Sequence, residues 1–145
     1  MATTLTMVTV RWPRAYLIHV GDSRCYRLRG GQLGRLTRDQ TMAQAMLDAG
    51  ALSADQAEQS RFKHILYSAL GGREVVPDAA STDIQWDDVW LLCTDGLTKH
   101  VSDEEIGEHL ARPEAAEITC RRLVDLALER GGSDNVTVVV GRLKR

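Results

Sequence analysis

Three aspartates lie at the boundaries of apolar stretches in this sequence. Asp22 follows YLIHVG, Asp95 follows VWLLCT, and Asp134 directly precedes NVTVVV. Taken singly, each aspartate is typical of a turn, because Asp-Gly and Ser-Asp-Asn segments suit tight turns through hydrogen bonds from the side chain to the backbone. For any one of them the turn is the more frequent explanation. As a set, the three aspartates suggest a further chemistry.

Carboxylates at the ends of neighbouring strands can converge on one point, since adjacent strands of a sheet lie about 4.7–4.9 Å apart. Crowded carboxylates repel one another, so they must either take up a proton or hold a cation. Oxygen ligands suit a hard cation such as Mg²⁺ or Mn²⁺. The set therefore predicts a cation site, at which Gly96 would let the backbone turn away after Asp95 and leave room for metal-bound water.

The motifs of other common sites are absent from the sequence. There is no CxxC, HExxH, GxSxG or GxxxxGK[ST], so the corresponding zinc sites, hydrolase elbows and Walker phosphate loops have no support. The histidines are scattered, and each is more often a packed or surface residue than a ligand; they are His19, His64, His100 and His109. The cysteines are far apart and odd in number, which predicts reduced packing residues; they are Cys25, Cys93 and Cys120.

Size and charge narrow the class of protein. A chain of 145 residues is long enough for one domain with its own core. A net charge of −2 without a clustered basic stripe argues against nucleic acid as a partner. Acidic residues are in excess among residues 81–145, which suggests a cation, although a solvated acidic face is the more frequent reason for such an excess.

The N-terminal sequence MATTLTMVTV has neither a basic segment nor a long apolar one, as a secretory signal would. No apolar run approaches the roughly 18 residues that a membrane span requires. We therefore expect a cytoplasmic protein that has no membrane partner.

The first part of the chain is predicted to be β-structure followed by short helices. Residues 4–36 hold four short runs rich in β-branched and aromatic residues, which we expect to form an antiparallel meander. Residues 41–50 show helical spacing and end on Gly50, and Ser53 with Gln56 matches a capping box. Two short helices with a mobile connection are expected here.

Strands and helices alternate again in the second part. We expect a partly exposed strand and a buried one around a tight turn at Asp87-Asp88, and a helix that begins in the capping box SDEE at 102–105. An amphipathic helix should run from Pro113 to Gly131, and Val136 to Val140 should be a buried strand. The helix should bury one apolar stripe, made of Ala116, Cys120, Leu123, Val124, Ala127 and Leu128. This order of elements predicts an α+β fold in which helices cover sheets.

Three segments in this order and at these separations carry a family resemblance: Gly21-Asp22-Ser23-Arg24, Thr94-Asp95-Gly96-Leu97 and Ser133-Asp134-Asn135. With them the chain resembles the bacterial branch of the metal-dependent serine/threonine protein phosphatases of type 2C, in the C-terminal portion of the catalytic domain. LTRDQT, ALGG and VSDEEI are further matches, so the likeness runs from about Thr3 to Val140. A lone Asp-Gly would be nearly worthless, but the ordered set is specific.

The resemblance implies a fold and a reaction. The fold would be part of a four-layer α-β-β-α sandwich with mainly antiparallel sheets, in which residues 41–66 resemble the mobile flap beside the active site. In this family two Mg²⁺ or Mn²⁺ ions activate a water that attacks phosphoserine or phosphothreonine, without a phosphoenzyme. Carried over by position, Asp95 and Asp134 would bind one core metal, and Asp22 would belong to a third metal or to its water.

Two departures from the family pattern follow from the same comparison. The phosphate-binding Arg, the Asp-Gly that bridges both metals and a proposed general-acid histidine belong to a first half that has no match here. We therefore expect residues 1–145 to be a single, N-terminally incomplete domain that begins in the middle of the family's sequence. Lys99 stands where many members have an acid that helps hold the third metal, and we expect it to be a solvated surface residue.

The resemblance also implies partners and leaves alternatives open. Phosphorylated proteins, the substrates of a bacterial serine/threonine kinase, would be the partners, and an uncovered sheet would favour an oligomer or a completing N-terminal segment. The chain could be an active phosphatase, a truncated fragment of one, or an inactive phosphatase-like module that binds or regulates. An unrelated α+β domain whose aspartates are only turn residues is the remaining possibility.

Overall fold

The computed structural model describes residues 2–145, whose strands form two antiparallel sheets. One sheet has the order β1-β2-β5, and the other has the order β4-β3-β6-β7. The strands are β1 (Leu5–Arg11), β2 (Arg14–Val20), β3 (Arg24–Arg29), β4 (Gln32–Arg35), β5 (Asp78–Asp83), β6 (Val89–Cys93) and β7 (Val138–Arg142).

The predicted strands of residues 4–36 are all present, but the prediction that they form one meander is wrong. β1 pairs with β2 and β3 pairs with β4, while β2 and β3 belong to different sheets. The chain changes sheet at Gly21, whose φ of 110° is outside the range that other residues readily adopt. The tight turn at Asp87 is confirmed by its φ of 70°, and it too connects the two sheets instead of closing a hairpin.

Five helices complete the fold, and two of them begin as predicted. They are α1 (Met42–Asp48), α2 (Ala54–Glu58), α3 (Asp95–Thr98), α4 (Asp103–Ala111) and α5 (Ala116–Glu129). Both capping boxes are formed, Ser53 with Gln56 before α2 and Ser102 with Glu105 before α4. No helix among residues 2–145 is both long enough and apolar enough to cross a membrane.

The start and the buried face of α5 differ from the prediction. The helix begins at Ala116 after an N-cap at Ala115, so Pro113 is not its first residue. Leu123 and Ala127 are buried as expected, whereas Leu128 is 55% exposed. The apolar stripe is therefore rotated, because the helix packs through one face on β7 and the sheet beneath it.

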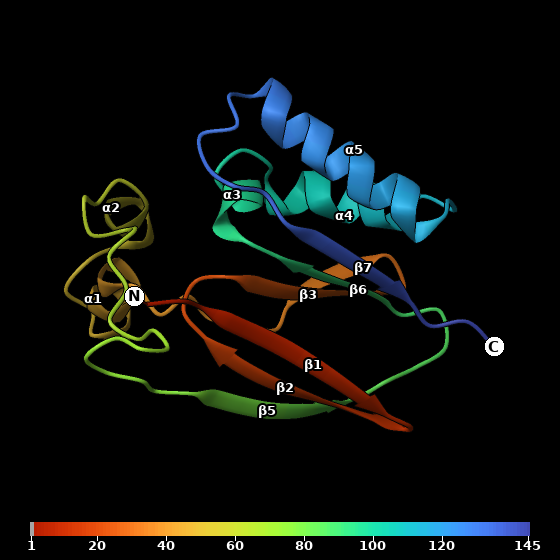
Figure 1. Cartoon of the computed structure of the whole chain (residues 1–145), viewed down its shortest axis with the longest axis horizontal. Helices are drawn as coiled ribbons and strands as arrows, with labels where there is room; N and C mark the ends of the chain where they lie inside the picture. The colour runs from red at the N-terminus through yellow and green to blue at the C-terminus, as the bar shows by residue number, and fades with distance from the viewer. Residues whose placement is uncertain (1) are drawn as a thin grey trace.

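The elements stack in three layers, two sheets and one layer of helices (Figure 1). α3, α4 and α5 cover one face of the β4-β3-β6-β7 sheet, and the β1-β2-β5 sheet lies against its other face. Each interface has its own core. Tyr26, Leu91 and Ile106 belong to the core under the helices, and Cys25 and Trp90 belong to the core between the sheets. Residues 2–145 thus form an α+β fold with three layers of the expected α-β-β-α sandwich, namely one layer of helices and two sheets.

β7 is an edge strand, so the prediction that Val136 to Val140 is a buried strand is wrong. It pairs only with β6, and its residues are alternately half-buried and exposed, with Val139 56% exposed. A run of valines is typical of a strand covered on both faces. Here one face packs on the sheet's helices and the other stays open to solvent, which a run of identical residues cannot indicate.

The outer face of the β1-β2-β5 sheet carries apolar side chains that no other layer covers in the described residues. Met7 lies opposite Ile18 in the register of β1 and β2, and Leu5 and Tyr16 lie on the same face. These four side chains are 37–46% exposed. At the far end of this sheet Trp12 and Trp86 stack with their ring centroids 4.4 Å apart.

His19 ties the β1-β2-β5 sheet to the segment that leads into α1. It is 1% exposed, its Nδ1 lies 2.9 Å from Thr6 Oγ1, and its Nε2 lies 3.1 Å from the carbonyl oxygen of Arg38. Because a carbonyl only accepts, Nε2 carries a proton. The Thr6 hydroxyl that bonds to Nδ1 also lies 3.3 Å from the carbonyl oxygen of Ser23. Burial lowers the pKa of His19, and the nearby carbonyls and acids only partly offset this effect.

We expect His19 to make folding sensitive to mild acid. The folded state disfavours the protonated ring, so the unfolded state binds more protons and stability falls as the pH drops below about 6.5. His19→Gln, whose amide can donate to Arg38 and accept from Thr6, should lose less stability between pH 7.5 and pH 5.5. Denaturant unfolding at both pH values measures this, with the exposed His64→Gln as a control. Equal losses for the wild type and His19→Gln would refute the assignment.

Gly96 is required by a close approach of two segments. It lies inside α3 and is buried, and a Cβ at this position would sit 2.3 Å from the carbonyl oxygen of Asn135. The expectation that Gly96 turns the backbone away from Asp95 is therefore wrong. A glycine is needed because the loop before β7 packs directly on the first turn of α3.

We predict that Gly96→Ala destabilises the protein by about 1–3 kcal/mol, because the methyl group forces backbone apart. Gly107→Ala is the matched control, since it is also in a helix and its Cβ would meet Leu33 at an ordinary 3.6 Å. The control should be neutral or stabilising by up to about 1 kcal/mol. Thermal and urea unfolding of the two variants compare them. If Gly96→Ala is as stable as Gly107→Ala, the contact with Asn135 does not constrain the fold.

Candidate metal centre

Asp95 and Asp134 are brought together by an extension of the pairing between β6 and β7. Beyond the end of β6, the backbone N–H of Thr94 donates to the carbonyl of Thr137 over 3.1 Å. The Thr94 hydroxyl accepts from the N–H of Thr137 over 3.0 Å and donates to the carbonyl of Asn135 over 3.2 Å. These bonds fix the loop that carries Asp134 beside the first residue of α3, which is Asp95.

Lys99 joins the two carboxylates. Its Nζ lies 2.7 Å from Asp95 Oδ2 and 2.6 Å from Asp134 Oδ2, and its side chain is 23% exposed. The prediction that Lys99 is a solvated surface residue is therefore wrong. The side chain reaches Asp95 because residues four apart share one face of a helical turn.

The charges of this group reinforce one another. The hydrogen bond from Lys99 is the main reason why the pKa of Asp134 is lowered, with a second hydrogen bond from the N–H of Asn135. Burial opposes the charge on Lys99, but the hydrogen bonds and charges of Asp134 and Asp95 outweigh it and raise its pKa. The lysine is thus held in its charged form between Asp95 and Asp134.

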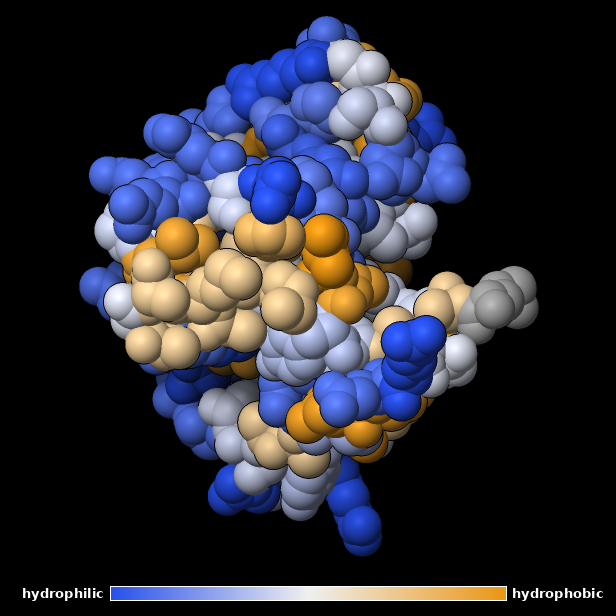
Figure 2. Space-filling view, turned by 90° about the vertical axis from the view of Figure 1, so that its left-hand side faces the viewer, coloured by the Kyte–Doolittle hydropathy of each residue, from blue (hydrophilic) through white to orange (hydrophobic). Residues whose placement is uncertain are grey.

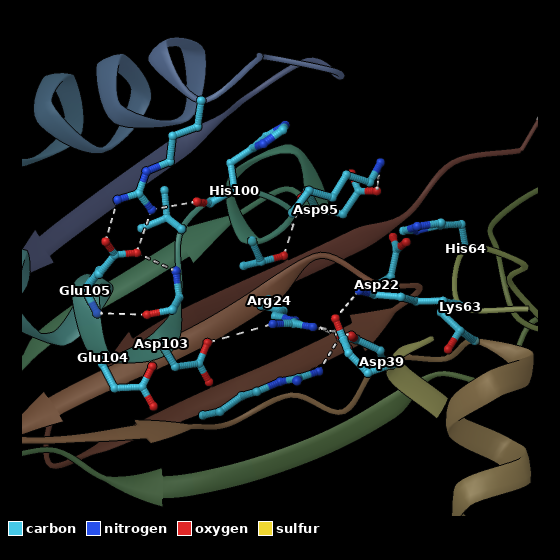
Figure 3. Close-up of a pocket in the computed structure, with 18 residues that line it drawn as sticks. Asp22, Arg24, Asp39, Lys63, His64, Asp95, His100, Asp103, Glu104 and Glu105 are labelled. Carbon is cyan, nitrogen blue, oxygen red and sulfur yellow. Dashed lines mark hydrogen bonds and ion pairs between the residues drawn. The ribbon is translucent and has the colours of Figure 1, made fainter. Parts of the chain in front are cut away.

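Asp22 faces the same region from the turn between β2 and β3, as Figure 3 shows. Burial raises its pKa, and the negative charges of Asp95 and Asp39 raise it further. A hydrogen bond from its own backbone N–H and the charge of Lys99 offset this only in part, and no ion pair forms with the Asp22 carboxylate among the described residues. It is therefore the acid in this group that is least compensated.

Asp22 and Asp95 line an open cavity of about 600 Å³ whose wall is almost entirely polar or charged. Each Arg or Lys on its wall pairs with an acid. The pairs are Arg24 and Arg35 with Asp39, Lys63 with Glu58, Lys99 with Asp95 and Asp134, and Arg130 with Glu105. In the part of the chain that the structure describes, this cavity consequently offers a phosphate group no cation that is free of an acidic partner.

Sequence reasoning did not identify the Arg24 side of the cavity. Arg24 donates to both oxygens of Asp39 and to the hydroxyl of Tyr26, which in turn donates to Asp103 Oδ1 over 2.7 Å. Asp39 comes from the LTRDQT segment and Asp103 from the SDEE capping box, so both were noticed only as helix-entry residues. The signal was Arg24 itself, an arginine directly after the Gly-Asp-Ser turn.

Residues 41–66 form α1, α2 and a closing bridge between Thr41 and Leu66, beside the cavity. Lys63 and His64 line the cavity from this segment (Figure 3). Figure 2 shows the end of the molecule that carries it, where apolar side chains gather at mid-height between hydrophilic regions. That the segment moves as a flap stays a prediction.

The residues present do not form a divalent metal site. Among residues 2–145 there is no group of three or more His, Cys, Asp or Glu side chains arranged to hold an ion. Asp95 and Asp134 close around an ammonium group, and Asp22 lines the same cavity as Asp95 without joining this pair. The roles of Asp95, Asp134 and Asp22 as metal ligands stay predictions.

Comparison with known proteins places this geometry in a family. No family model matches the chain. The chain is 44% identical over 140 residues to the serine/threonine protein phosphatase PstP of Mycobacterium tuberculosis, covering 97% of this chain and 27% of PstP. It is 33% identical over 141 residues to the protein phosphatase PhpP of Streptococcus pneumoniae, covering 97% of this chain and 57% of PhpP.

Solved structures agree with the sequence matches. The chain superposes on the crystal structure of the catalytic domain of PstP in complex with two manganese ions, with a TM-score of 0.87 and 43% identity. The match covers 100% of this chain and 60% of that one. The chain thus spans between about a quarter and three fifths of the length of these relatives. It belongs to the bacterial branch of the metal-dependent serine/threonine protein phosphatases, and it corresponds to part of their catalytic domain.

Proposed function

We propose that the chain is part of a protein phosphatase that hydrolyses phosphoserine and phosphothreonine by means of metal-activated water. The observation that carries the proposal is that Asp95 and Asp134 lie side by side in a chain that superposes along its whole length on a manganese-bound phosphatase domain. In this proposal Asp95 and Asp134 are ligands of one core Mg²⁺ or Mn²⁺, and Asp22 belongs to a weaker third ion or its water.

The contribution of these residues is to position carboxylates. When bound, a pair of divalent ions supplies a nucleophilic water of lowered pKa and neutralises phosphate oxygens. The Thr94 hydrogen bonds and the packing of Gly96 on Asn135 hold two of the carboxylates at one sheet edge. Since each Arg and Lys on the cavity wall is paired with an acid, the described residues alone provide little to attract a phosphate.

We expect the isolated 145-residue chain to hydrolyse p-nitrophenyl phosphate and a phosphothreonine peptide poorly in Mn²⁺. The reason is that its described residues supply no complete metal site. Phosphate release measured against Asp95→Ala should show no difference above background. Robust Mn²⁺-dependent turnover that Asp95→Ala abolishes would contradict this expectation and would establish a working site within these residues.

A catalytically inactive, phosphatase-like module that binds or regulates is the second candidate. The observation that favours it is the pairing of Lys99 with both Asp95 and Asp134, which already neutralises part of their charge. Binding of the phosphothreonine peptide without turnover, measured by fluorescence anisotropy against its unphosphorylated form, would support this candidate. The partners proposed in either case are phosphorylated proteins of the kind that a bacterial serine/threonine kinase produces.

We also expect the uncovered face of the β1-β2-β5 sheet to drive association with a second copy of the chain. Met7→Thr combined with Ile18→Thr removes two facing apolar side chains from it and should reduce self-association, because exposed apolar sheet surface favours contacts. Light scattering at increasing protein concentration measures this. Val139→Thr, on the exposed side of β7, is the control and should associate as the wild type does. A wild-type chain that stays monomeric at every concentration would refute the expectation.

A further inference from the structure

We propose that the ammonium group of Lys99 is a built-in cation for the Asp95–Asp134 pair, so that a divalent ion reaches these two carboxylates only by displacing it. The inference goes beyond the proposed function, because it concerns how the two acids are neutralised. The competition between Lys99 and a divalent ion can be measured as metal binding, even if the chain has no phosphatase activity.

The position of Lys99 is built by the fold and is not that of a free surface side chain. The backbone N–H of Lys99 donates to the carbonyl of Asp95 over 2.9 Å, which closes the turn of α3. The same turn places Nζ within 2.7 Å of Asp95 Oδ2, while the loop packed on Gly96 brings Asp134 Oδ2 to 2.6 Å from it. Two segments far apart in the sequence therefore converge on one ammonium group.

The ammonium leaves few oxygens for another cation. Of the four oxygens of the pair, Oδ2 of each aspartate binds Lys99, and Asp134 Oδ1 accepts from the N–H of Asn135 over 2.8 Å. Only Asp95 Oδ1 has no protein partner among the described residues. A hard divalent ion takes about six oxygen ligands, preferably carboxylates and water. The positive charge of the ammonium group between the two Oδ2 atoms repels such an ion from them.

Lys99 also competes with a soluble ion from a favourable position. It is tethered within the same turn as Asp95, so its local concentration is high and independent of dilution. The alternative role for a lysine at this position is to bind phosphate. Both ion pairs of Lys99 are with acids, however, so two carboxyl groups share one positive charge. The geometry fits a lysine that satisfies carboxylates better than one that waits for an anion.

The test measures Mn²⁺ binding to the purified chain. Titration calorimetry and the electron paramagnetic resonance signal of free Mn²⁺ are the two readouts. Lys99→Ala and Lys99→Gln remove the charge, and we expect each to bind Mn²⁺ at least about tenfold more tightly than the wild type. Lys99→Arg keeps a cation at this place and should bind as weakly as the wild type. Adding Asp134→Ala to Lys99→Gln should abolish the gain, which assigns it to this pair.

Thermal unfolding provides a second measurement that does not depend on the strength of the calorimetric signal. Without divalent ions, Lys99→Gln should unfold at a lower temperature than Lys99→Arg, because its two acids repel each other without a cation. Added Mn²⁺ should raise the unfolding temperature of Lys99→Gln and leave that of the wild type nearly unchanged. Equal Mn²⁺ affinities for the wild type, Lys99→Ala and Lys99→Gln, whether strong or absent, would overturn the proposal.

Discussion

The arrangement of this molecule depends on the contact between α3 and the loop that precedes β7. The carbonyl of Asn135 approaches Gly96 so closely that no side chain fits between them, and Thr94 bonds to the same loop through its backbone and its hydroxyl. These bonds continue the β6–β7 ladder beyond the strands themselves. Since Asp95 begins α3 and Asp134 lies on the loop, one backbone contact sets the separation of both carboxylates.

The two cores position this contact. β6 is covered on both faces, with Leu91 facing the helices and Trp90 facing the other sheet, so its end is rigidly placed. α5 then returns the chain across the helical layer to β7 at the sheet edge (Figure 1). The charged cavity lies where β6 ends and where β2 passes to β3.

Much of this could be predicted from residue types and spacing. An apolar run followed by Asp95 indicated the strand β6, and the capping boxes at Ser53 and Ser102 indicated two helix starts. That the three aspartates share a metal site stays a prediction, and of the three only Asp22 and Asp95 line the cavity. The passage of the chain from one sheet to the other at Gly21 could not be predicted, because consecutive strands usually pair with each other. β2 and β3 are separated by the way the two cores pack, which involves residues far apart in the sequence. Likewise, the exposure of Val139 depends on which face of β7 another layer covers, and the sequence of β7 does not encode this.

The role of Lys99 lay outside sequence reasoning for a related cause. Its contacts require the single turn of α3, which is too short to show a period, and the approach of a loop 35 residues away. The sequence Thr94-Asp95-Gly96-Leu97 indicated an acid at a sheet edge, but it did not indicate that Lys99 pairs with this acid. The local pattern therefore located the acids, and tertiary packing determined their partners.

The edge position of β7 limits how long Asp95 and Asp134 stay together before the strand opens locally. Asp134 is held through a strand with one neighbour, and edge strands belong to the parts of a protein that open locally at low free-energy cost. Each fraying event at this edge would carry Asp134 away from Asp95 while leaving the covered strand β6 in place. The amides of Thr94 and Thr137 should consequently exchange with solvent hydrogen together, as one cooperative unit, on the timescale at which the two carboxylates separate.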